Sequence, residues 1–316
     1  MGVTQGCLWA TLRSFDHIEM RPGGREEVLE DVAEDFPYLA VLSQHDRYCE
    51  RTVPWHWHQE LEFFYVLEGT VDYATPHERM VLPAGTAGFV NANVLHMTRA
   101  TDGAPNVNLL IHMFRPNLVA ERGSRIWRTL VEPLVRATSI ELVAVTPDDA
   151  GTAALRDATL AAFDLAVHEE PGWELRLRDA LGEIWAGFLE VVRPRLAEGP
   201  AELPNARDER LKAMVDYVGR HYPERVEVAD IAAAAFTSER ECHRTFRECL
   251  GQTPSQYLRE YRVQQACRML AHTTRPVAAV ARMCGLGSAS HFGQVFRDAM
   301  GCTPSEYRAA WQKHDN

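Results

Sequence analysis

Hydrophobic residues between positions 36 and 114 fall into short runs that Gly and Pro separate. The runs span residues 38–42, 61–69, 71–74, 87–91 and 107–114, and Gly69, Pro76, Pro83, Gly85 and Gly103 punctuate them. Short apolar runs that recur at close intervals between turn residues are typical of β-sandwiches and barrels. We therefore predict a β-barrel domain over residues 36–120, after an N-terminal extension (residues 1–35) that carries an acidic helical stretch from Arg25 to Asp35.

Residues 121–197 show the helical period instead. Seven apolar positions share one helix face: Leu177, Leu181, Ile184, Trp185, Phe188, Leu189 and Val192. Such a stripe predicts an amphipathic helix. Two interpretations stay open at this point. The helices cover the β domain, or the stretch Leu181–Val192 forms part of a homodimer seam.

A linker and an internal repeat follow. Residues 198–206 hold Gly and two Pro and read as a linker before a helical domain over residues 207–316. Shifting this domain by 50 residues aligns it with itself, and the string GxTPSxY, at Gly251 and again at Gly301, stands in both copies behind a Phe-Arg pair. One structural unit therefore occurs twice.

Each copy predicts a helix-turn-helix. A short apolar helix (residues 228–235 or 277–284) precedes a tight turn, and Ser238 or Ser288 is then placed to cap a second helix. The second helix of such a pair enters the DNA major groove. With Cys242 and Phe246, or Phe292 and Phe296, facing the core, the outward residues are Arg240, His243, Arg244 and Arg247 in the first copy and Ser290, Gly293, Gln294 and Arg297 in the second.

The charge distribution restricts DNA binding to this second domain. The 316 residues carry a formal net charge of −11, which by itself disfavours nucleic acid. Residues 1–204, however, hold 17 Lys and Arg against 31 Asp and Glu, whereas residues 205–316 hold 16 against 13. An arginine can bond the O6/N7 edge of guanine bidentately, which is worth about 1–3 kcal/mol of discrimination.

Residues 208–311 resemble the DNA-binding domain of the AraC/XylS family of bacterial transcription regulators. The resemblance rests on IAAAAFTSERECHRTFRECLGQTPSQYL and VARMCGLGSASHFGQVFRDAMGCTPSEYR. It implies two helix-turn-helix units joined by a long helix over about residues 254–271, and activation by contact with RNA polymerase at promoter DNA. It also implies base-reading roles for Arg240, His243 and Arg244 in the first unit and for Ser290, Gly293 and Gln294 in the second.

The β region holds a cluster of candidate ligands. His56, His58 and Glu62 are followed by Gly69, and Gly85 is followed by Asn91, Asn93 and His96. Imidazole and carboxylate suit zinc, manganese, iron or nickel, and we expect His56 and His58 to share one face of a strand. The spacing resembles the cupin double motif, which implies the cupin barrel, although Glu50, Asn91 and Asn93 replace a Gly, a Pro and a Gly of that motif.

Two uses of these residues stay open: they hold a divalent metal, or they only line a pocket for a small-molecule effector. The candidate pocket walls are aromatic: Trp55, Trp57, Phe64, Tyr65, Tyr73 and Phe89. We expect an α+β multidomain chain, with a cupin-like barrel and flanking helices before an all-α double helix-turn-helix domain. The alternative function is a metal-dependent cupin oxygenase or isomerase with a helical appendage.

The remaining features suit a cytoplasmic regulator without a membrane segment. The seven cysteines follow no CxxC spacing, which disfavours a disulfide framework or a zinc knuckle. The first residues lack the cationic and apolar blocks of a signal peptide. We expect a homodimeric transcription regulator, an activator, that responds to a small-molecule effector and is not an enzyme.

Overall fold

The computed structural model describes residues 12–15, 18–21, 24–29, 32–101, 103, 106–197 and 206–311. The chain divides into two compact units, and each unit is made of two separate segments of the chain. Unit 1 comprises Met1–Glu19 and Glu26–Asn205, and unit 2 comprises Met20–Arg25 and Ala206–Asn316. The predicted linker, residues 198–206, lies outside the described residues except for Ala206, which begins the first helix of unit 2.

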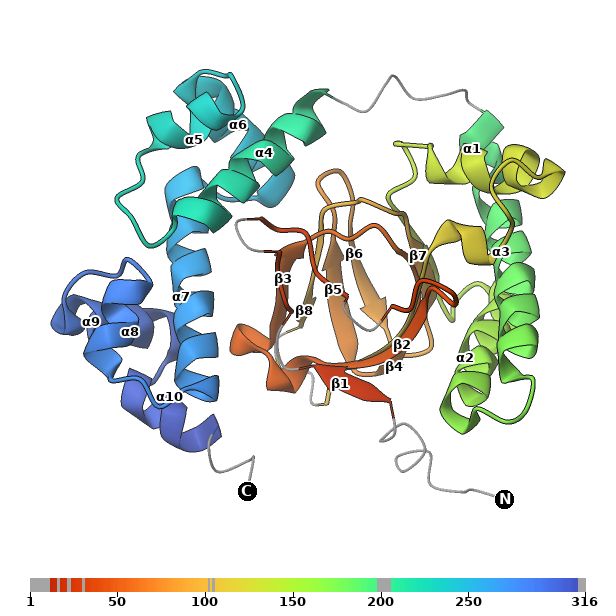
Figure 1. Ribbon diagram of the computed structural model, residues 1–316, viewed down its shortest axis with the longest axis horizontal. Coiled ribbons are helices and arrows are strands. Elements are labelled where there is room, and N and C mark those ends of the chain that lie inside the picture. The colour runs from red at the N-terminus through yellow and green to blue at the C-terminus, as the bar shows by residue number, and fades with distance from the viewer. Residues whose placement is uncertain are drawn as a thin grey trace. The chain divides into compact units, whose positions relative to one another are not determined.

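Unit 1 is built from two sheets. The six-stranded sheet has the order β1-β2-β9-β4-β7-β10, with bounds Arg13–Phe15, Tyr38–Gln44, Asn108–Phe114, Leu61–Glu68, Ala87–Val90 and Leu142–Val145. The four-stranded sheet has the order β3-β8-β5-β6, with bounds Thr52–His56, His96–Ala100, Thr70–Ala74 and Arg79–Pro83. The pairings are antiparallel except for β1 with β2. Figure 1 shows the strands curving into the predicted barrel.

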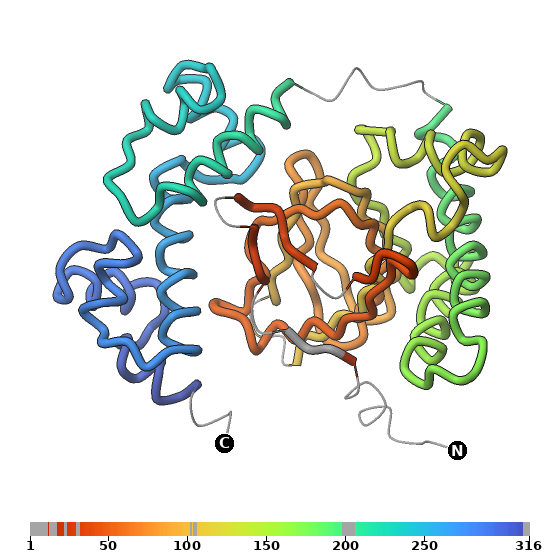
Figure 2. The backbone as a smooth tube through the Cα atoms, viewed as in Figure 1, coloured from red at the N-terminus to blue at the C-terminus, as the bar shows by residue number. Residues whose placement is uncertain are grey.

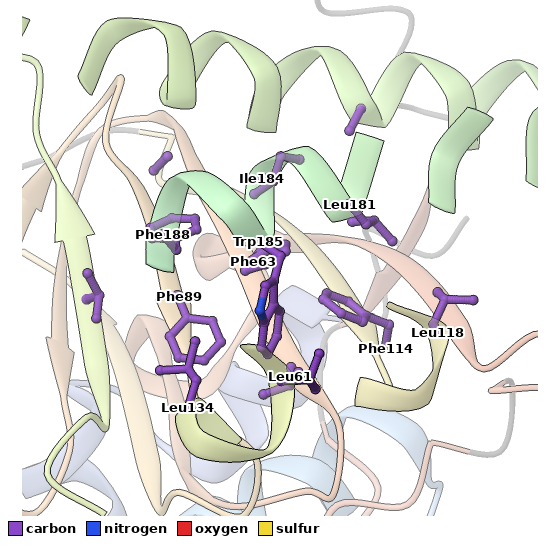
Figure 3. Close-up of a cluster of buried hydrophobic side chains, with 14 of the residues drawn as sticks. Leu61, Phe63, Phe89, Phe114, Leu118, Leu134, Leu181, Ile184, Trp185 and Phe188 are labelled. Carbon is purple, nitrogen blue, oxygen red and sulfur yellow. The ribbon is translucent and has the colours of Figure 1, made fainter. Parts of the chain in front are cut away.

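The side chains of strand β4 point alternately into the barrel and toward a hydrophobic core on its outer face. Glu62, Phe64 and Val66 point into the barrel, whereas Leu61 and Phe63 belong to a hydrophobic core on the outer face. Helices α1 (Glu132–Val135), α2 (Ala153–His168) and α3 (Trp173–Ala197) enclose that outer core. The ring of Phe63 stacks on Phe188 of α3 with centroids 5.2 Å apart. Figure 3 shows both residues in the cluster of buried side chains between the strands and α3.

The apolar face of α3 is therefore used within the chain. Leu181, Ile184, Trp185, Phe188 and Val192 are each at most 2% exposed. Covering the β domain is the interpretation that the structure confirms, and these residues cannot at the same time form a dimer seam. Homodimerisation itself stays a prediction.

Two predictions of secondary structure are wrong. The stretch from Arg25 to Asp35 contains no helix in its described part, because the backbone N–H of Glu27 donates to the carbonyl of Trp57 (2.8 Å) and pairs the segment with the barrel. Inside the predicted helical region, Leu142–Val145 forms strand β10 against β7. A four-residue apolar run is too short for its period to distinguish strand from helix.

Unit 2 consists of two helical pairs and the helices around them. The helices are α4 (Ala206–His221), α5 (Val228–Ala234), α6 (Glu239–Leu250), α7 (Pro254–His272), α8 (Val277–Met283), α9 (Ala289–Met300) and α10 (Pro304–Trp311). Figure 2 follows the chain from the first pair, α5 and α6, through the long helix α7 to the second pair, α8 and α9. The duplicated helix-turn-helix and its connecting helix are confirmed.

The repeated residues act as helix signals. Ser238 and Ser288 accept hydrogen bonds from the N–H groups of Glu241 and His291, which caps α6 and α9. Gly251 and Gly301 end these helices in the left-handed conformation. In both GxTPSxY strings the Thr also caps the next helix, and the third residue after it, Gln256 or Glu306, bonds back to the Thr N–H.

The turns of the two copies differ by one residue. Thr237 N–H donates to the carbonyl of Ala232 as Leu286 N–H does to that of Ala281. Phe236 therefore occupies the place of Gly285, and Gly287 is an insertion. Phe236 has φ +52°, and its side chain is 98% exposed. A non-glycine residue in this region costs about 1–2 kcal/mol.

Replacing Phe236 by Gly should stabilise unit 2. We expect Phe236→Gly to raise the opening free energy of unit 2 by about 0.5–1 kcal/mol, since strain is lost without loss of a contact and the flexibility of Gly offsets only part of the gain. Native-state hydrogen exchange of the slowest amides in α6 and α7 measures it. Phe236→Ala should leave the value near that of the wild type; reduced protection in Phe236→Gly would show that the aromatic ring makes a stabilising contact.

Candidate functional site: a buried histidine–carboxylate cluster and a helix-turn-helix face

The four predicted ligands of the barrel meet in its interior. One ligand atom from each of His56, His58, Glu62 and His96 lies within 4.8 Å of all the others, and the four residues are buried. His56 ends β3, Glu62 lies in β4 and His96 begins β8. His58 lies beyond the end of β3, so the expectation that it shares a strand face with His56 is wrong. The chain turns after β3 and brings the two rings to a centroid distance of 5.8 Å.

Backbone carbonyls orient the three imidazoles. The Nδ1 atoms of His56 and His96 lie 2.8 Å from the carbonyls of Pro54 and Val94, and that of His58 lies 3.0 Å from the carbonyl of Glu60. Because a carbonyl only accepts, each Nδ1 carries the proton and each Nε2 faces the cluster. Metal-binding histidines are held in this way. The buried Nε2 of His96 has no hydrogen-bond partner in the described structure.

Glu62 is the negative centre of the cluster. Its Oε1 lies 3.0 Å from His58 Nε2 and 3.5 Å from His96 Nε2, and its Oε2 accepts a 2.7 Å hydrogen bond from Tyr73. Burial opposes its charge, but the histidines hold the pKa of Glu62 well below its usual range. Burial likewise opposes protonation of His58, yet Glu62 raises the pKa of that imidazole to about 9. His58 Nε2 is therefore protonated at neutral pH, and a cation would have to displace this proton to bind there.

The cavity beside the cluster is small. It measures about 30 Å³ and is lined by His56, Glu62 and His96 of the cluster, by Tyr73 and by apolar side chains such as Val41, Val53 and Met113. This is space for about one water molecule. Of the six aromatic residues predicted as pocket walls, Tyr73 lines this cavity, and Trp55, Trp57, Phe64, Tyr65 and Phe89 do not. Tyr65 and Phe89 point outward, Tyr65 toward α2 and Phe89 against Trp185 of α3. Tyr65 lies three positions after the inward-facing Glu62, so strand alternation places it on the outer face.

The departures from the cupin double motif keep its backbone geometry. Glu50 and Asn93 stand where the motif has Gly, and they have φ +54° and +62°, values that favour glycine. Asn91, in place of Pro, is buried and donates to the carbonyls of Leu134 (2.9 Å) and Ile140 (3.2 Å). Asn91 and Asn93 thus shape the loop that leads to His96, whereas Glu50 lies in the turn before β3.

The outward face of α6 carries the predicted DNA contacts of the first unit. Arg240, Arg244 and Arg247 are exposed, and His243 is half-buried. Cys242 and Phe246 lie in the core, as predicted. Arg244 forms a solvent-exposed ion pair with Glu241, with 2.7 Å between Nη2 and Oε1. An exposed pair contributes little to stability, so the guanidinium can exchange it for a base edge.

The second unit presents a weaker face. Ser290, Gln294 and Arg297 are exposed on α9, and Gly293 is half-buried. Gln294 Nε2 donates to Asp298 Oδ1 at 2.7 Å. Phe292 and Phe296 form the core pair, with ring centroids 5.5 Å apart. A Gln side chain suits the edge of an adenine. The exposed face of α9 carries a single arginine, Arg297, whereas that of α6 carries three.

Comparison with known proteins agrees with both units. Residues 231–310 match a helix-turn-helix domain model and residues 50–112 a cupin domain model. The uncharacterized HTH-type transcriptional regulator YdeC of Bacillus subtilis is 25% identical over 90% of this chain and 95% of its own. The HTH-type transcriptional activator RhaS of Enterobacter sp. is 34% identical over 37% of this chain and 40% of its own. A solved transcriptional regulator of Chromobacterium violaceum with an AraC-type DNA-binding domain is 30% identical over 33% of this chain and 93% of its own, with a TM-score of 0.32.

The chain is an AraC-type transcriptional regulator with a cupin domain. The relatives of this regulator are transcription regulators, which confirms the expectation that it is not an enzyme. Within its described part, none of the helices has the length and apolar character needed to cross a bilayer.

Sequence reasoning missed Glu27 of the regulator. Its side chain is 9% exposed, and its Oε2 lies 3.5 Å from His56 Nε2 with no hydrogen-bond partner among the described residues. Burial raises the pKa of Glu27 to about 8. No spacing rule could have found it, because it reaches the cluster from a segment far from both halves of the motif.

Arg244 of the regulator provides a test of the α6 face. Arg244→Ala should relax base preference at one position of the bound duplex by about tenfold, since a bidentate arginine–guanine pair is worth about 1–3 kcal/mol. Selection from a random duplex library followed by sequencing measures this preference. Arg225→Ala, an exposed arginine outside α6, is the matched control. An unchanged sequence preference for Arg244→Ala would remove Arg244 from the base-reading residues.

Proposed function

We propose that this DNA-binding regulator is controlled by a ligand held at His56, His58, Glu62 and His96, and that the ligand is a divalent metal ion. The observation that carries the proposal is the convergence of three Nε2 atoms and a carboxylate in a buried cluster whose imidazoles are already oriented through Nδ1. Zinc, manganese, iron and nickel all accept this donor set. Such an ion would supply a fixed positive charge that draws the four side chains together.

The space at the cluster favours an ion over an organic effector. A cavity of about 30 Å³ is far below the roughly 300 Å³ at which ligand pockets begin. Tyr73 and Phe64, whose stacked rings lie 5.0 Å apart, fill the adjoining barrel interior. A sugar or an organic acid would have to displace these side chains, whereas an ion would only replace the proton on His58.

The chain's own residues would make the response specific. Tyr73 holds Glu62 through the 2.7 Å hydrogen bond, and the carbonyls of Pro54, Glu60 and Val94 hold the rings. Ligand binding changes DNA affinity only as far as the ligand prefers the DNA-competent state. We further propose that two subunits pair on two half-sites of promoter DNA, and that the bound regulator activates transcription by contacting RNA polymerase, as its family resemblance implies.

Metal binding can be measured directly. The full chain, titrated with Zn²⁺ against a chromogenic chelator, should bind one ion per chain. His96→Ala should weaken binding by more than about 100-fold, since loss of an outer partner alone costs about 10–100-fold. His168→Ala, an exposed histidine on α2, should bind as the wild type does.

The contrary result is equally clear. If neither Zn²⁺ nor Mn²⁺, Fe²⁺ or Ni²⁺ bound to the folded wild type, or if His96→Ala bound Zn²⁺ as tightly as the wild type, the cluster would not be a metal site. A thermal-shift screen of small organic molecules would then test whether the same residues line an organic effector pocket, because a ligand of the folded state raises its stability.

A further inference from the structure

Within unit 2, a direct contact joins the two helix-turn-helix pairs that α7 connects along the chain. It is made by residues 222–224, which we call the α4–α5 turn, and by two partners from other elements. One partner is Arg262 of α7, and the other is Gly285 in the turn between α8 and α9. Because α4 packs on α5 and α6, the α4–α5 turn belongs to the first pair, and its contact with Gly285 bridges the two pairs.

Arg262 holds the backbone of the α4–α5 turn. Its Nε donates to the carbonyl of Tyr222 at 2.7 Å, and its Nη2 donates to the carbonyl of Glu224 at 2.6 Å. These carbonyls follow the end of α4, where backbone oxygens lack partners within the helix and favour a cation. The planar guanidinium donates in fixed directions, so the two bonds fix the orientation of the turn as well as its position. The ring of Tyr222 also contacts that of Tyr261 edge to face, with centroids 5.0 Å apart.

Gly285 brings the second pair against the same turn. A Cβ atom on Gly285 would lie 2.5 Å from the carbonyl oxygen of Tyr222 and 2.8 Å from that of Pro223, which is closer than a side chain can approach. Cys284 and Leu286, on either side of Gly285, are buried in unit 2. The turn between α8 and α9 therefore cannot move away from the α4–α5 turn without exposing apolar side chains.

The first copy of the repeat shows that the backbone conformation alone does not require glycine at this place. Phe236 is the equivalent of Gly285 and has φ +52°, against +66° for Gly285. The side chain of Phe236 is 98% exposed, so it extends into solvent without obstruction. The contact with the α4–α5 turn is what restricts position 285 to glycine.

This contact restricts how the two recognition helices can move relative to each other. The second helix of each pair enters the major groove, so the distance and angle between α6 and α9 determine which two DNA segments one chain can bind together. Figure 2 shows α7 as the chain connection between the pairs. A single connecting helix leaves each pair free to rotate about the residues at its ends. A further point of contact removes that freedom.

We propose that Arg262, Gly285 and the α4–α5 turn fix the relative orientation of α6 and α9 and thereby set the spacing of the two DNA segments that one chain binds. This inference goes beyond the proposed function, because it requires no ligand in the barrel. It assigns positioning roles to Arg262 and Gly285, which lie outside α6 and α9. These residues control the spacing of the bound segments, and the outward residues of α6 and α9 control the choice of bases.

The tolerance of binding to altered spacing tests the proposal. The full-length wild type is used to select a duplex from a random library, and one base pair is then inserted between two adjacent segments that hydroxyl-radical footprinting shows to be protected within one half-site. The insertion moves one segment by about 3.4 Å along the duplex and rotates it by about 35°. The wild type should lose at least tenfold in affinity. Arg262→Ala and Gly285→Ala should bind the original duplex more weakly and lose less than threefold on insertion, because their pairs can adjust.

Matched controls separate positioning from stability. Gly301→Ala introduces a Cβ at a similar φ, +69°, where no atom of the described residues beyond its chain neighbours lies within 4 Å, so it should keep the tenfold loss on insertion. Arg225→Ala removes an exposed arginine just after the α4–α5 turn and should behave as the wild type. Circular dichroism shows whether each variant is folded. A wild type that tolerates the insertion, a folded Arg262→Ala or Gly285→Ala that loses tenfold, or a Gly301→Ala that tolerates it would each overturn the proposal.

Discussion

The alternation of side chains along β4 is the constraint on which unit 1 depends. One strand sends Glu62 into the barrel, where it faces His58 and His96, and sends Phe63 outward, where it stacks on Phe188 of α3. If β4 slipped in register by one residue, Phe63 would point into the barrel beside the histidines. Glu62 would then be buried, without its partners, in the hydrophobic core under α3. The core under α3 therefore holds β4 in register, and with it Glu62 of the cluster.

The second unit depends on a different rule, that of local helix signals repeated in tandem. Caps at Ser238, Thr253, Ser288 and Thr303 begin α6, α7, α9 and α10, and left-handed stops at Gly251 and Gly301 end α6 and α9. The two copies have diverged where they meet solvent. The first has a strained turn at Phe236 and an arginine-rich face, and the second has a relaxed turn at Gly285 and a glutamine. Because the positive balance of this unit is modest, we expect α6, with its exposed arginines, to contribute most of the DNA affinity.

These two rules explain what the sequence could predict. The helix-turn-helix units were found because their signals are local. The convergence of His56, His58, Glu62 and His96 was predicted because these residue types stand at the spacing of a known motif; that they bind a metal stays a prediction. Tyr65 and Phe89 were misassigned although period-two counting from Glu62 places Tyr65 outward. The approach of Glu27 to His56 was beyond reach, since it comes from a segment whose composition favoured helix and that lies outside both halves of the motif. Strand β10 was missed because tertiary pairing with β7 decides the state of so short an apolar run.

The account joins a buried charged cluster to a DNA-binding face, so its most direct test measures both at once. The affinity of the full chain for a duplex selected from a random library should be determined at fixed salt, with saturating Zn²⁺ and with a chelator. A coupling of the usual size, about 1–3 kcal/mol, predicts a difference of about 5- to 150-fold between the two conditions. Equal affinities, with Zn²⁺ shown to be bound, would contradict control of DNA binding by the barrel site.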